Sequence, residues 1–99
     1  MRETTLVRVT EKHIRAGKPC SSGDCPFALA VIEALAAEGV TVAEVTVDFY
    51  DVTVVQADES GCRRYRATMP GEGRRFVNDV DDKRPVSPFA VELRWELAA

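Results

Sequence analysis

The sequence predicts an α+β domain of two layers, in which a mostly antiparallel β-sheet of about four to five strands carries one main helix and one short helix on one face. Residues 26–37 are apolar except for Glu33, which is typical of a buried helix. Residues 40–56 and 89–97 are rich in β-branched residues or alternate with a period of two, which indicates strands. The 99 residues and 45% hydrophobic content suit a single domain over residues 1–99.

The first elements are a strand and a short helix. Residues 6–10 alternate in polarity as a half-buried strand does. Thr10 offers a hydroxyl that could cap a helix over residues 11–16, and Gly17 is expected to end this helix in the left-handed conformation. Residues 18–24 are rich in Pro, Ser and Gly and are predicted to form a loop.

The main helix is expected to begin at Pro26. Proline suits the first helical position, because its missing N–H has no partner there and its fixed φ already fits a helix. Asp24 or Cys25 is then the N-cap, and Gly39 ends the helix. An apolar surface on nearly every side indicates that more than the sheet covers this helix, and a dimer contact is one way to do so.

Residues 40–56 exceed the length of an ordinary strand, so a turn or bulge near residues 49–51 is expected to divide them. Phe49 is predicted to share one face with Val45 and Val47.

The C-terminal half predicts a hairpin, one helical turn and a last strand. Residues 57–61 have the composition of a hairpin loop that leads to a strand from about 62 to 68. Residues 74–80 are expected to form one helical turn. The last strand is predicted to turn alternate residues into the core: Phe89, Val91, Leu93, Trp95 and Leu97.

Composition and charge exclude several classes of protein. The net charge of −3 gives no global attraction to nucleic acid or to an anionic membrane. No apolar run approaches the roughly 18 residues of a membrane span, and residues 1–10 lack the apolar block of a signal peptide, so a soluble, cytoplasmic protein is expected. No phosphate loop, nucleotide-binding glycine fingerprint or nucleophile elbow occurs, and no cofactor is predicted.

Cys25 lies at the predicted helix start, where unpaired N–H groups and the helix dipole stabilise a thiolate. This position suggests a thiol-dependent enzyme or redox protein, with Cys20 as resolving thiol and His13 as base. The alternative is that Cys25 is a small buried hydrophobe at the junction of loop and helix. We favour the second interpretation, because four residues separate the two cysteines and the sequence does not place His13 beside either.

A zinc site is the weaker alternative for the same residue types. Its ligands would be His13, Cys20, Cys25 and Cys62, but their spacing matches no standard finger or ribbon. Acidic side chains at residues 79–82 lack the glycine and distant glutamate of a calcium loop. No metal is therefore predicted.

Five arginines and one aromatic residue form the candidate binding set. On a strand, alternate residues point to the same side, so part of this set could contact phosphate groups while the aromatic ring stacks on a base. The acidic balance of the chain favours a solvated edge strand instead. The set consists of Arg63, Arg64, Tyr65, Arg66, Arg74 and Arg75.

Three short motifs resemble a group of small actinobacterial and actinobacteriophage proteins of uncharacterised function. They are H-I-x-x-G at residues 13–17, C-P-x-A-L-A at residues 25–30 and P-F-x-(apolar)-x-L at residues 88–93. The resemblance implies that His13, Gly17, Cys25 and Pro26 form a linked structural unit. It implies no activity.

The leading hypothesis is a small non-enzymatic protein-interaction module of phage or mobile-element origin, which binds a host or viral protein. The absence of catalytic motifs, the apolar helix and an open sheet edge motivate it. A homodimer is a secondary expectation. The alternatives are the thiol-dependent enzyme and a nucleic-acid binder that uses the arginine set.

Overall fold

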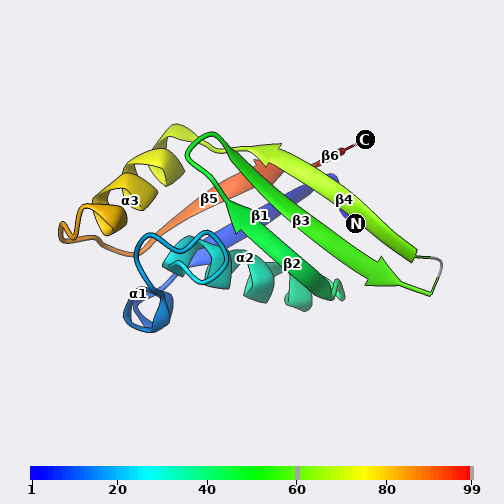
Figure 1. Cartoon of the computed structure of the whole chain (residues 1–99), viewed down its shortest axis with the longest axis horizontal. Helices are drawn as coiled ribbons and strands as arrows, with labels where there is room; N and C mark the ends of the chain where they lie inside the picture. Colours follow the sequence, from blue (N-terminus) through cyan, green and yellow to red (C-terminus); the bar gives the residue numbers. More distant parts are fainter. Residues whose placement is uncertain (60, 99) are drawn as a thin grey trace.

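The computed structural model describes residues 1–59 and 61–98. In chain order the elements are β1 (Thr4–Val9), α1 (Glu11–Ala16), α2 (Pro26–Ala37), β2 (Val42–Val47), β3 (Asp51–Asp58), β4 (Gly61–Thr68), α3 (Gly71–Asp81), β5 (Phe89–Arg94) and β6 (Glu96–Leu97) (Figure 1). All strand pairs are antiparallel, which confirms the α+β class. None of the described helices is long and apolar enough to span a membrane.

The strands form two sheets, ordered β1–β5 and β2–β3–β4–β6. Only Trp95 separates β5 from β6, so the last strand of the chain leaves the first sheet and joins the second. Because of this break, Leu97 does not continue the buried face of β5. Its side chain is 69% exposed, and its predicted core position was wrong.

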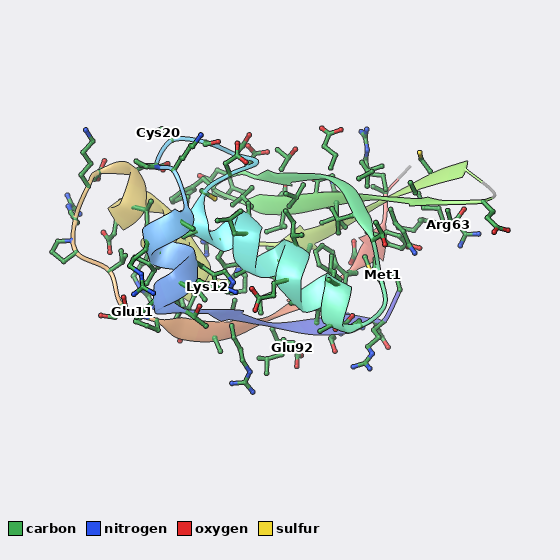
Figure 2. The ribbon with its side chains drawn as sticks, turned by 90° about the horizontal axis from the view of Figure 1, so that it is seen from below. Met1, Glu11, Lys12, Cys20, Arg63 and Glu92 are labelled. Carbon is green, nitrogen blue, oxygen red and sulfur yellow. The ribbon has the colours of Figure 1, made fainter. Side chains whose placement is uncertain are left out.

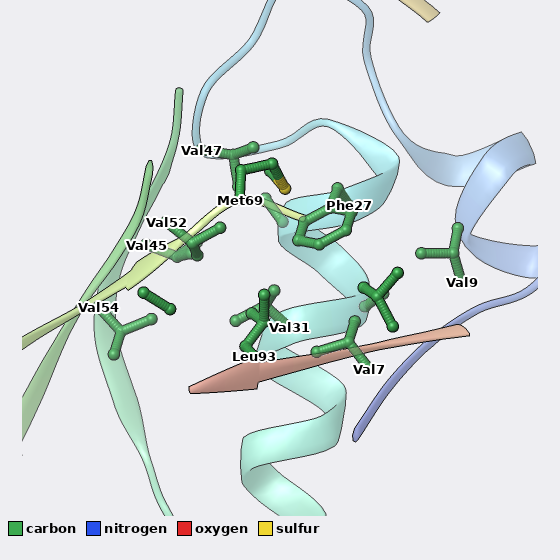
Figure 3. Packing of buried hydrophobic residues seen from close by; sticks show 14 of the residues in the cluster. Val7, Val9, Phe27, Val31, Val45, Val47, Val52, Val54, Met69 and Leu93 are labelled. Carbon is green, nitrogen blue, oxygen red and sulfur yellow. The ribbon is translucent and has the colours of Figure 1, made fainter. Parts of the chain in front are cut away.

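The core lies between the two sheets and is centred on α2. Figure 3 shows Phe27 and Val31 of α2 between the valines of the four-stranded sheet and Val7 and Leu93 of the two-stranded sheet. Phe27, Val31 and Leu35 are fully buried, since helix positions four apart lie on one face. Burial of such a face supplies most of the stability of a helix in a folded protein.

The start of α2 is as the sequence predicted. Cys25 is the N-cap, Pro26 is the first helical residue, and Gly39 adopts a left-handed φ of 81° after the helix.

Gly17 ends α1 for a different reason from the predicted one. Its φ is −75°, so the left-handed stop was wrong. A Cβ at this position would overlap Cδ and N of Pro26. Glycine is therefore required because α1 and the start of α2 approach closely, and this contact joins two of the three motifs.

The predicted division of residues 40–56 is confirmed, with a tight link between β2 and β3. The helix near residues 74–80 is longer than one turn and begins at Gly71. Pro70 is its N-cap, where a missing N–H costs nothing. Gly73 lies against the Met69 side chain, since a Cβ there would be 2.5 Å from Sδ. Residues 70–73 therefore form the N-cap and the first turn of α3.

Candidate functional site: the aromatic tip

The arginines of the candidate binding set do not form one patch. Arg64 and Arg66 point to the outer face of the four-stranded sheet, opposite Val55 and Thr53 of β3. Arg63 lies near the end of the β3–β4 hairpin, at the opposite end of the molecule from Glu11 and Lys12 of α1 in Figure 2. Tyr65 lies on the opposite face from Arg64 and is half-buried against the core.

Arg74 and Arg75 belong to α3, at the other end of the sheet. With Phe49 and Asn78 they line a hollow of about 260 Å³. No ion pair joins either guanidinium to a carboxylate in the part of the chain that the structure describes. These two charges are therefore free to meet a carboxylate of another molecule.

Phe49 and Tyr50 lie, with Asp48, in the three-residue link between β2 and β3. Asp48 N donates to Asp51 O at 2.8 Å and closes the turn. Tyr50 O accepts from Met69 N at 2.7 Å, which ties the turn to the segment before α3. Positions in such turns favour glycine, asparagine and aspartate, and two aromatic residues here serve no local conformational need.

Both rings are exposed to solvent. Phe49 is 46% exposed and Tyr50 is 65% exposed, and the rings pack edge to face with centroids 4.9 Å apart. The predicted placement of Phe49 on the buried face of Val45 and Val47 was wrong, because the chain reverses at this residue. We call Phe49, Tyr50, Arg74 and Arg75 the aromatic tip.

No role was predicted for Phe49 and Tyr50 from the sequence. The signal was present as two large aromatic residues between two aspartates within a predicted turn. The sequence could not show that Phe49 lies close to Arg74 and Arg75, because this depends on how α3 packs beside the β2–β3 turn.

Cys25 is 4% exposed and serves as the N-cap of α2. Its Sγ accepts a hydrogen bond from Ala28 N at 3.5 Å. Burial raises the pKa of the Cys25 thiol, and this effect exceeds the opposing effect of the helix N–H groups. A buried thiol of raised pKa lacks the thiolate character that nucleophilic catalysis requires.

The other potential metal and redox ligands lie apart. Cys20 is exposed, and its backbone N–H donates to Asp81 Oδ1 at 2.8 Å. Cys62 is exposed on β4, opposite Ala57. Over residues 1–59 and 61–98, no group of three or more His, Cys, Asp and Glu side chains is arranged to hold a metal ion.

His13 is buried and bonded on both ring nitrogens. Thr10 N donates to Nδ1 at 3.0 Å, so the neutral ring carries its proton on Nε2. Nε2 donates to Glu33 Oε2 at 2.7 Å. Lys12 Nζ lies 3.3 Å from the same oxygen. These bonds lower the pKa of the Glu33 carboxyl. The bond from His13 has the largest effect, and the bond from Lys12 has the next largest. His13 thus holds α1 against α2, and its partner is Glu33.

The aromatic tip consists of Phe, Tyr and Arg side chains, and these residue types are enriched in protein–protein interfaces. The chain as a whole matches no protein-family model, no curated protein and no solved structure.

Proposed function

We propose that the protein is a small, non-enzymatic protein-interaction module that binds a partner protein through its aromatic tip. The observation that carries this proposal is the exposure of Phe49 and Tyr50 in a turn that has no need for aromatic residues. Large exposed apolar side chains cost solubility, so their presence in a hydrogen-bonded turn favours a contact role.

The neighbouring charges suggest the chemistry of the partner surface. Arg74 and Arg75 can each bind a carboxylate through two N–H groups, while the rings enter an apolar depression. An acidic surface with an apolar depression is thus the expected partner. The resemblance to actinobacteriophage proteins supports a host or viral protein in this role and an origin in a phage or mobile element.

Quantitative affinity capture from a lysate of the source cell tests the proposal. The tagged wild-type protein is compared with the double variant Phe49→Ser/Tyr50→Ser. Loss of both aromatic side chains is expected to weaken binding by at least about thirtyfold, since truncation of a single hot-spot residue costs about 2 kcal/mol or more. Arg74→Glu/Arg75→Glu is expected to weaken it as well and to reverse its salt dependence, because added salt then screens a repulsion between like charges.

Leu97→Ser is the matched control, because Leu97 is as exposed as Tyr50 but lies on β6. The control should recover the same partner as the wild type. Equal recovery by the aromatic variant would exclude the aromatic tip as the contact surface. A gel shift with nucleic acid at low salt, lost in Arg64→Glu/Arg66→Glu, would favour the nucleic-acid alternative instead.

A further inference from the structure

The first strand of the chain has a free edge. β1 pairs with β5 and, over residues 1–59 and 61–98, with no second strand. Hydrogen bonds alternate along an antiparallel pair, and Glu3 O accepts from Trp95 N. The odd-numbered residues of β1 therefore bond toward β5, and Thr4, Leu6 and Arg8 turn their N–H and C=O groups to the open edge.

A groove of about 510 Å³ runs along this edge, between β1 and α2. Its strand side includes Leu6 and Arg8, and its helix side includes Ala30, Ala34 and Ala37. Leu6 is 48% exposed, although it lies in the middle of a strand. Figure 2 shows α2 lying along β1, with Glu92 of β5 on the outer face. The three small alanine side chains leave room beside the edge at the roughly 4.8 Å spacing of a paired strand.

We propose that this edge binds an extended segment of another protein, which adds to β1 as an antiparallel strand. Three free N–H and C=O pairs supply the backbone bonds, as in other proteins that bind peptides by strand addition. This surface shares no residue with the aromatic tip, so it is independent of the proposed function.

Charge and size specify the segment. Side chains directly opposite each other in an antiparallel pair lie on the same face and interact, and opposite charges there are favourable. Two arginines and three carboxylates line the groove. Arg2 and Arg8 have no ion-pair partner in the described part of the chain, whereas Glu33 is already bonded to His13 and Lys12, and Glu38 accepts from Thr5. The third carboxylate, Glu92, lies on β5 opposite Leu6, where the segment should carry no charge of its own. The segment should place carboxylates opposite Arg2 and Arg8, an apolar side chain opposite Leu6, and small side chains at the alternate positions that face α2.

A second copy of this chain fits the groove less well. Symmetric pairing of β1 about Leu6 would bring the second α2 to the same face of the joined sheet. The inward residues of the second β1 would be Thr5 and Val7, which are buried in their own core. A second β1 therefore could not offer the small side chains that must face α2 in the groove.

The seven-residue peptide EAVATAE, blocked at both ends, is the probe. Its first glutamate lies opposite Arg8, its valine opposite Leu6 and its last glutamate opposite Arg2. Isothermal calorimetry with the full chain should detect binding. KAVATAK, with lysines at both ends, should bind at least tenfold more weakly, and EFVFTAE should fail because its phenylalanines meet α2.

Two variants test the position and the register. Ala37→Phe fills the groove and should weaken binding at least tenfold, whereas Ala36→Phe, on the other side of α2, is the control and should not. Arg8→Glu should weaken binding of EAVATAE about fivefold and bind KAVATAE in its place, because only the residue opposite Arg8 has changed.

Amide hydrogen exchange locates the bound strand. Exchange at Leu6 and Arg8 should be fast in the free protein and at least tenfold slower with the peptide, while Val7 is protected in both. Failure of EAVATAE to bind at millimolar concentration, or protection outside β1, would overturn the proposal. Sedimentation of the free chain as a dimer with Leu6 and Arg8 already protected would assign the edge to a second copy, which also overturns it.

Discussion

At the scale of single residues, the clearest electrostatic feature is the pair of His13 and Glu33. His13 is buried, and its ring bonds to the Thr10 backbone and to the Glu33 carboxylate at once. A carboxyl whose pKa is lowered on folding stabilises the native state above its unfolded-state pKa. That contribution begins to be lost as the pH falls below about 4.5, the ordinary pKa of glutamate. The loss is complete once the pH has fallen through the lowered pKa of the folded state.

Glu33→Gln should remove this pH-dependent contribution. The amide oxygen still accepts from Nε2 of His13, so stability at low pH should match the wild type, while stability at pH 7 should be lower. Urea denaturation followed by circular dichroism at both pH values measures the difference. Glu44→Gln, which alters an exposed carboxylate outside any observed ion pair, should leave the pH profile unchanged. Parallel profiles for wild type and Glu33→Gln would show that the pair is not coupled to folding.

At the scale of elements, the start of α2 decides between a structural and a reactive cysteine. Cys25 is the N-cap residue and its Sγ accepts from Ala28 N, so it functions as a cap. Iodoacetamide should label Cys20 and Cys62 rapidly, because both are exposed. Cys25 should stay unlabelled in the native protein at pH 8 and react only after denaturant is added, since its thiol is buried and its pKa is raised.

Peptide mass spectrometry over a pH series reads each site separately. Rapid native labelling of Cys25 well below its ordinary pKa would contradict the cap and favour the thiol-dependent enzyme. Cys20→Ser/Cys62→Ser isolates the Cys25 signal and serves as the control for exchange between thiols.

The same element shows what sequence could and could not predict. Proline at the first position, a capping side chain and a terminal glycine are local signals, and they located α2 correctly. Gly17 was misjudged because its role is to let α1 approach the start of α2, which no local pattern records. The aromatic tip was not predicted for the same reason, because the β2–β3 turn and α3 come together only in the folded chain.

At the scale of the whole molecule, the two sheets are joined where the last strand crosses between them at Trp95. Its indole Nε1 donates to Thr5 Oγ1 at 2.8 Å, and the Thr5 hydroxyl donates to Glu38 Oε1 at 3.1 Å. This chain of bonds connects β1, the end of α2 and the crossing point. The period-two pattern of residues 89–97 predicted one continuous strand, because alternation alone does not show which partner each half pairs with.

Thr5→Val tests whether this connection stabilises the fold. Valine keeps the shape of threonine but leaves the buried indole N–H without an acceptor, which should lower the free energy of unfolding by about 1–3 kcal/mol. Trp95 is the single tryptophan of the chain, so its fluorescence reports directly on the crossing point during urea unfolding. Thr4→Val is the control, because Thr4 lies on the outer face of the same strand and its hydroxyl makes no hydrogen bond observed among the described residues. If the two variants unfold at the same urea concentration, packing alone holds the sheets together. If only Thr5→Val is weakened, a buried polar chain fixes the point at which the last strand changes sheets.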